Sequence, residues 1–221
     1  MLYVADVNTA DIMPSRPMRR AKPYHHGHLR EALLEAAIRL IAEVGPTAFT
    51  LREVARRAGV SHNAPYRHFH DRDDLMAAVA VQGFRELTRA MTEAAAGKSD
   101  ALDRLKHAGL GYVTFALRRP QHFTVMFDAP IPRRKHPDSA VASEEAFATL
   151  LGFVKSCQEA GQLVSGDLRE MALLAWTMVH GIAKLAITGR LPFRPNSQIL
   201  EFSEFVIDQS LPTGRRDNHR D

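Results

Sequence analysis

The stretch TLREVARRAGVSHNAPYRHF, residues 50–69, decides how the rest of the chain is interpreted. Its first four residues form a capping box, because the Thr50 hydroxyl and the Glu53 carboxylate can each bind a backbone N–H group that a helix start leaves unpaired. Gly59 can end this helix, since glycine adopts the left-handed conformation at little cost. The pattern predicts a short helix over 51–58 followed by a tight turn.

The second half of the stretch predicts another short helix, over 62–69. Ser61 is a favourable N-cap residue, and Pro65 lies near the first turn, where a missing N–H costs least. A helical apolar period predicts a longer helix before the stretch, from about residue 27 to the Gly45-Pro46 break. Two short helices joined by a glycine-containing turn and preceded by a longer helix form a helix-turn-helix.

The exposed face of the second short helix carries side chains that suit the major groove of DNA. Asn63 can make a bidentate pair with adenine, Ala64 can contact a thymine methyl group, and His62 can hydrogen-bond to base edges. Other residues suit phosphate contacts, which position a protein on DNA without reading its sequence. They are Thr50, Arg52, Tyr66 and Arg67.

The basic charge is concentrated around this motif. The whole chain of 221 residues has a net charge of +4. Residues 16–70 hold ten Lys and Arg against four Glu, a net charge of +6, and the remainder holds 19 Lys and Arg against 21 Asp and Glu, a net charge of −2. Six of the 11 histidines also lie between His25 and His70. This asymmetry indicates an anionic partner at the basic end.

The rest of the chain also predicts helices, over about 72–96, 100–118, 121–128, 139–160, 167–189 and 196–210. We therefore predict an all-α protein of about nine helices, in which a small three-helix unit joins a larger bundle. The predicted parts are a flexible basic arm (1–22), a helix-turn-helix DNA-binding domain (23–71), a ligand-binding and dimerisation domain (72–210) and a flexible tail (211–221).

Composition and hydropathy disfavour several classes of protein. The single cysteine, Cys157, excludes a disulfide framework within the chain and a multi-cysteine zinc site, and we expect it to be an inert, half-buried thiol. The first 15 residues lack the basic start of a signal peptide. The most apolar stretch, 171–187, contains His180 and Lys184 and is short for a membrane span. These features predict a cytoplasmic protein.

Residues 25–75 resemble the DNA-binding unit of the TetR family of transcriptional regulators. That unit ends in Gly-Val-Ser, then Tyr-x-His-Phe, a basic residue and a Leu. This chain has Gly59-Val60-Ser61, Tyr66, His68, Phe69, Arg72 and Leu75. The resemblance adds His68 and Arg72 to the candidate DNA contacts, with Arg72 standing where the family usually has Lys. Many members have a Gly-Thr-Leu run in place of Asn63-Ala64-Pro65, so base readout is not carried over.

Two further matches are to parts of that family. Tyr24-His25-His26-Gly27 and Ala64-Pro65-Tyr66 are similar to one subgroup, and Trp176-x-x-x-His180-Gly181 is similar to the WHG-type regulatory domain. The resemblance implies a repressor that needs no cofactor and acts as a homodimer on a palindromic operator in double-stranded DNA. It implies dimerisation through the helices at about 167–189 and 196–210, and release of DNA by a small-molecule effector in the C-terminal bundle.

Candidate effector contacts are the large side chains of that bundle. They are Phe115, Phe123, Met126, Phe127, Phe147, Trp176, Met178 and His180. Aromatic and Met residues at helical spacing also serve as plain core. Trp176 and His180 share a helix face, so a satisfied core histidine, a ligand contact and a dimer contact all stay open for this pair.

Other readings of the sequence are weaker. A protein that binds DNA without sequence preference would explain the charge, but the polar side chains at 62–67 argue against it. For a small helical enzyme, the best acid–base set is His180 with Asp167 or Glu170, without a phosphate-binding loop or metal-ligand spacing. His25, His26 and His28 lack a clear cluster of partners for a metal, so we expect a solvated or phosphate-contacting segment there.

Overall fold

The computed structural model describes residues 28–132, 134–193 and 195–213. These residues form eight α-helices and one short 3-10 helix, and they contain no strand, only a lone β-bridge between Leu163 and Thr213. The predicted all-α class is confirmed. The predicted basic arm, the Tyr24–Gly27 motif and the tail beyond residue 213 lie outside the described residues.

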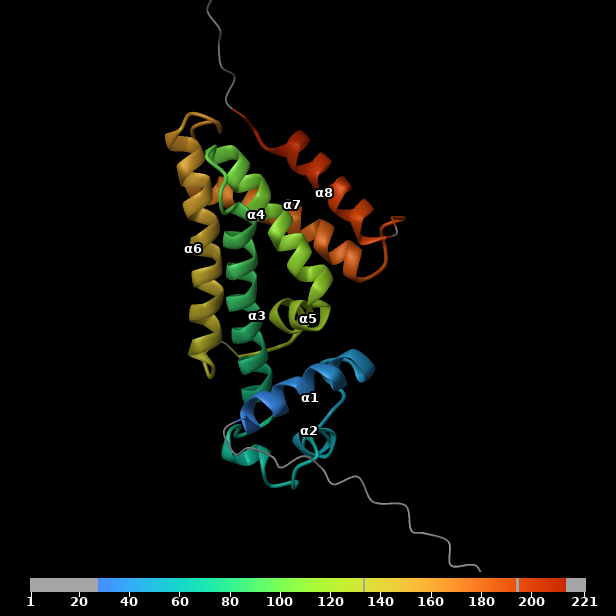
Figure 1. The fold of residues 1–221 in the computed structure, drawn as a ribbon. Helices are drawn as coiled ribbons and strands as arrows, with labels where there is room; N and C mark the ends of the chain where they lie inside the picture. Colours follow the sequence, from blue (N-terminus) through green and yellow to red (C-terminus); the bar gives the residue numbers. More distant parts are fainter. Residues whose placement is uncertain (1–27, 133, 194, 214–221) are drawn as a thin grey trace, which may run out of the picture.

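A small unit of helices lies at one end of the molecule and begins with α1 (Leu29–Val44) and α2 (Leu51–Ala58) (Figure 1). The predicted capping box is present, since Thr50 N donates to Glu53 Oε2 at 2.8 Å and Glu53 N donates to Thr50 Oγ1 at 3.3 Å. Gly59 ends α2 in the left-handed conformation at φ 71°. An ion pair between Arg57 and Glu43 joins α2 to α1.

The predicted α-helix over 62–69 does not form. Only the 3-10 helix η1 (Pro65–Arg67) forms, with turns on either side. Proline has no N–H to donate to the carbonyl of Ser61, and that carbonyl accepts from Ala64 N at 2.9 Å instead. A three-residue step of this kind is 3-10 geometry. Ser61 therefore begins a turn rather than an α-helix.

Helix α3 (Arg72–Ala95) runs from the small unit into the larger bundle (Figure 1). The Asp71 carboxylate caps its start by accepting from Asp74 N at 2.9 Å. The other helices of the bundle are α4 (Ala101–Arg118), α5 (Pro120–Asp128), α6 (Pro137–Glu159), α7 (Leu168–Ile187) and α8 (Asn196–Ser210). The predicted domain boundary, between residues 71 and 72, falls at the start of α3. Because α3 packs against helices of both parts, this boundary stays a prediction.

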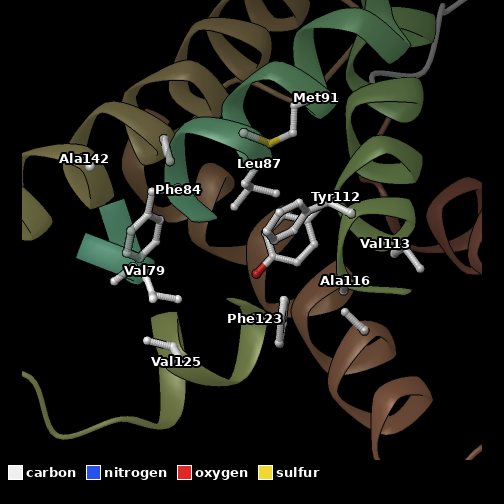
Figure 2. Close-up of a cluster of buried hydrophobic side chains, with 14 of the residues drawn as sticks. Val79, Phe84, Leu87, Met91, Tyr112, Val113, Ala116, Phe123, Val125 and Ala142 are labelled. Atoms are coloured by element: carbon white, nitrogen blue, oxygen red, sulfur yellow. The ribbon is translucent and has the colours of Figure 1, made fainter. Parts of the chain in front are cut away.

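One hydrophobic core runs through both parts of the molecule. Leu75 and Val79 of α3 are fully buried near the small unit, and Leu87 and Met91 are buried further along the same helix. In Figure 2, Leu87 and Met91 lie beside the ring of Tyr112 from α4. Helix α5 packs against α1, α3 and α4. The small unit is therefore joined to the bundle through α3 and α5.

By length and composition, α7 could cross a membrane, because it has 20 residues and an 18-residue window within it has a mean hydropathy of 1.3. The predicted short stretch at 171–187 is thus part of a longer helix. The core helix of a soluble protein meets the same test, and α7 packs here against α4, α6 and α8. Ala172, Ala175 and Ala183 lie on its buried side, and small side chains there allow close packing of neighbouring helices.

Candidate nucleic-acid interface and ligand cavity

The predicted DNA-contacting side chains gather around η1 and the start of α2. Most of them are exposed: Thr50, Arg52, His62, Asn63, Tyr66, Arg67 and His68. Ala64 is half-buried. The segment is anchored by Pro65 and Phe69, which are both buried. The chain therefore holds a short polar surface on an apolar base, with 52% of Tyr66 exposed.

Two arginines near this surface have contacts that the sequence did not suggest. Arg72 donates to the carbonyl of Thr47 at 2.7 Å and pairs with Asp73 at 3.3 Å. Arg72 therefore connects the start of α3 to the loop between α1 and α2. This role is additional to the phosphate contact that the resemblance implies for Arg72. Arg30 lies 5.6 Å from the centre of the Phe69 ring, a cation–π distance.

A cavity of about 630 Å³ lies in the bundle. Five predicted effector contacts line it: Met126, Phe127, Phe147, Trp176 and Met178. Phe115, Phe123 and His180 are not among the lining residues. Phe115 and Phe123 are buried in the core, and Phe123 stacks on His180 with ring centres 5.2 Å apart. Helical spacing alone could not separate the two groups, since both face inward.

Tyr112 is one of several cavity residues that sequence reasoning missed. Its hydroxyl accepts from Trp176 Nε1 at 3.2 Å and lies 2.8 Å from His180 Nδ1. Burial, and then the nearby Lys184 ammonium, lower the pKa of His180, so its ring is neutral at pH 7. Tyr112 and His180 therefore share one hydrogen bond, whose donor depends on which ring nitrogen of His180 carries the proton. The signal that could have found it is a Tyr in an apolar helix, because a buried hydroxyl needs a partner.

His180 is hydrogen-bonded to Tyr112 and not to Asp167 or Glu170, the acids considered for an enzyme. Asp167 caps α7 by accepting from Glu170 N at 2.9 Å. Cys157 is fully buried rather than half-buried as predicted, because it packs inside the bundle. Its thiol donates to the carbonyl of Ala101 at 3.1 Å, and burial raises its pKa to about 11. Among the described residues, no three His, Cys, Asp or Glu side chains come together as a metal site would need.

Two buried histidines lie near the junction of the two parts. His122 of α5 is 2% exposed, and neither ring nitrogen has a hydrogen-bond partner among the described residues. Burial lowers its pKa, against the opposing effect of Glu86. His136, just before α6, pairs through Nδ1 with Asp74 of α3 at 3.2 Å. The other oxygen of that carboxylate accepts from His70 N at 2.8 Å.

Comparison with known protein families covers both parts of the chain. Residues 33–79 match the family described as bacterial regulatory proteins, tetR family. Residues 105–209 match the family described as tetracyclin repressor-like, C-terminal domain. The second match includes the predicted Trp176, His180 and Gly181 motif. Between them the two matches cover the segment around η1 and most of the residues that line the cavity.

Individual proteins resemble the chain over part or most of its length. The HTH-type transcriptional repressor Rv3405c of Mycobacterium tuberculosis is 40% identical over 96 residues, 42% of this chain and 51% of that protein. The HTH-type transcriptional regulator BetI of Burkholderia mallei is 35% identical over 89 residues, 40% of this chain and 42% of that protein. The chain thus spans about half the length of the curated relatives that it matches.

Solved structures resemble the whole fold. A protein of unknown function from Rhodococcus is 33% identical with a TM-score of 0.74, over 87% of this chain and 100% of that one. The TetR family regulator PfmR of Thermus thermophilus has a TM-score of 0.67 over 82% of this chain and 95% of that one. The latter is 17% identical, so it speaks for the fold alone.

Proposed function

Because the chain belongs to the TetR family of bacterial regulatory proteins, a family of regulators rather than enzymes, we propose that it is a cytoplasmic, sequence-specific DNA-binding transcriptional repressor. A small molecule that enters the cavity in the bundle releases it from its operator. The observation that carries the proposal is the exposed polar segment 61–68, which is held on the buried side chains of Pro65 and Phe69.

Each group in this segment has a role suited to its chemistry. Asn63 reads base edges in the major groove, together with His62 and the methyl group of Ala64. Phosphate contacts come from Thr50, Arg52, Tyr66, Arg67, His68 and Arg72. Arg72 can serve only if its bond to the Thr47 carbonyl leaves one guanidinium edge for phosphate.

The repressor acts as a homodimer through α7 and α8. Leu174 and Leu185 of α7 are 48% and 45% exposed, and Phe205 of α8 is 61% exposed. Exposed apolar side chains on neighbouring helices favour association with another apolar surface. A two-fold dimer matches a palindromic operator whose half-sites lie about 34–36 Å apart or a multiple of that distance.

Release follows from a population shift. The effector must bind the DNA-free arrangement of the dimer more tightly than the DNA-bound one, because equal affinity for both would shift nothing. Helix α3 is the physical link, since it packs against the small unit and also lines the cavity through Phe84, Leu87 and Met91.

Selection of bound sequences from a random DNA library tests this function with the full chain. We expect a palindromic motif that is retained in the presence of excess random DNA. Retention that disappears with the competitor, with no enriched motif, would support the protein that binds DNA without sequence preference.

A further inference from the structure

The cavity has an uneven distribution of charge. Among its described lining residues, only Glu144 and Arg169 are charged. Glu144 is engaged in an interaction of its own. Arg169, in the first turn of α7, has no carboxylate within ion-pair distance among the described residues, and its guanidinium lies 5.3 Å from the centre of the Phe147 ring. The cavity therefore offers one positive group that is available for a ligand.

A continuous aromatic wall leads from Arg169 into the cavity. Phe147 lies 6.1 Å from Trp176, and Trp176 lies 6.3 Å from Phe127, measured between ring centres. Leu87 and Met91 of α3 add apolar contacts to the lining of the same cavity. This surface favours a flat or extended apolar body, and the volume is typical of a site for a drug-sized ligand.

The inner polar group of the cavity is already engaged within the protein. The Tyr112 hydroxyl accepts from Trp176 and shares a hydrogen bond with His180. A ligand's anionic group would have to compete with His180 for this hydroxyl, whereas Arg169 offers several donors. A cationic ligand fits less well, because the guanidinium of Arg169 already occupies a face of Phe147 and would repel it.

Resting on the proposed function, we infer that the effector is a hydrophobic carboxylate. Its carboxylate pairs with Arg169, and its apolar body lies along Phe147, Trp176 and Phe127. An arginine can hold a carboxylate by two parallel hydrogen bonds, which a lysine cannot reproduce. Arg169 is thus the residue that determines ligand charge, while the aromatic wall and α3 determine ligand shape.

Three probes that share one tail and differ in the head group test this inference. They are decanoate, decanol and decyltrimethylammonium, each kept below its micelle-forming concentration. Trp176 is the single tryptophan of the chain and lines the cavity, so its fluorescence reports binding directly. We expect decanoate to bind about tenfold more tightly than decanol, the effect of one charge-assisted pair, and the ammonium probe to bind most weakly.

The variant Arg169→Gln should remove the advantage of decanoate while the affinity for decanol stays the same. Arg169→Lys should keep part of it. Arg190→Gln, an exposed arginine that does not line the cavity, is the matched control and should change nothing. Circular dichroism of each variant verifies folding.

The inference is overturned if the ammonium probe binds as tightly as decanoate, if Arg169→Gln keeps the preference, or if none of the probes binds. Failure of the proposed function is a separate outcome, since it would appear in the DNA selection. A chain that selects an operator but binds none of the probes keeps the function and loses this inference. A chain that prefers decanoate but selects no DNA motif keeps this inference about the ligand and loses the proposed function.

Discussion

At the scale of single residues, Asn63 and Tyr66 lie on one exposed segment but have different proposed roles. We predict that Tyr66→Phe weakens binding to every DNA sequence by about 1 kcal/mol, because one phosphate hydrogen bond is lost. Asn63→Ala should cost about 1–3 kcal/mol on the selected operator only, because it removes a base contact. Titration of labelled operator and random duplexes with each variant measures both effects.

Lys98 is the control for this pair, because it is exposed in the loop at the opposite end of α3. Lys98→Ala should leave affinity for both duplexes unchanged. An equal loss on operator and random DNA for Asn63→Ala would contradict its assignment to base reading.

His122 gives a second prediction at this scale, on pH. Burial lowers its pKa in the folded state, whereas the unfolded chain binds a proton near the ordinary value of about 6.5. The unfolded state then holds more protons below that pH, so the free energy of unfolding falls as the pH decreases through about 6.5. His180 has a lowered pKa as well and acts in the same direction.

The variant His122→Leu should reduce this acid sensitivity. It should also raise the free energy of unfolding at pH 7 by about 1–3 kcal/mol, since it removes two buried nitrogens that have no hydrogen-bond partner in the described part of the chain. Chemical denaturation at pH 7 and pH 5.5 measures both. His70→Leu is the matched control, with a side chain that is 89% exposed. An unchanged pH profile in His122→Leu would show that other groups carry the acid sensitivity.

Single residues also show that the sequence could not predict which inward-facing side chains line the cavity. Met126, Phe127 and Trp176 were predicted as effector contacts and do line the cavity, but Phe123 has the same chemistry and lies in the core. Apolar type and helical spacing report that a side chain faces inward. They do not report whether the space beyond it is filled, because that depends on helices distant in sequence.

At the scale of elements, local signals predicted most helix bounds. The cap at Thr50 was predicted from a few adjacent residues and is present. Asp100 and Asp167 also cap helices, although only the helices that begin beside them were predicted. The predicted helix at 62–69 failed because Pro65 breaks the backbone ladder in a segment too short to compensate with another turn. A cap and a period indicate where a helix begins, but one missing N–H can reduce a short helix to a 3-10 turn.

The crossing of α3 and α4 gives a prediction at this scale. A Cβ atom at Gly111 would lie 2.5 Å from the carbonyl oxygen of Ala90 and 3.0 Å from the Cβ of Ala94. Gly111→Ala should therefore force the two helices apart and lower the free energy of unfolding by about 1–3 kcal/mol. Thermal and urea denaturation measure the change.

Gly152 of α6 is a matched control, since a Cβ there meets nothing within 4 Å. Gly152→Ala should stabilise the protein by up to about 1 kcal/mol, because alanine is the better helix former. If both variants are stabilised alike, the close approach at Gly111 does not constrain the packing of α3 on α4.

At the scale of the whole molecule, the small unit and the proposed dimer surface lie on different parts of the fold. In Figure 1, α1 and α2 form one end, and α8 lies along the outer side of the bundle beside α7. The basic charge belongs to the first part of the chain, with a net charge of +6 over residues 16–70. A dimer through α7 and α8 would leave both small units free for one DNA duplex.

The dimer gives the prediction that tests this arrangement. Phe205→Glu places a charge on the most exposed large apolar side chain of α8, and an unpaired charge in an interface is costly to bury. We expect a monomer in sedimentation velocity, with far weaker binding to a full operator and little change in the weaker binding to a half-site.

The matched control is Val141→Glu on α6, where the valine is 51% exposed and the same charge should leave the dimer intact. A Phe205→Glu protein that stays dimeric would exclude this face, and dissociation of Val141→Glu alone would move the interface to α6. Loss of the dimer with unchanged affinity for the full operator would show that the two half-sites are bound independently, so that the spacing between small units could not couple an effector to DNA release.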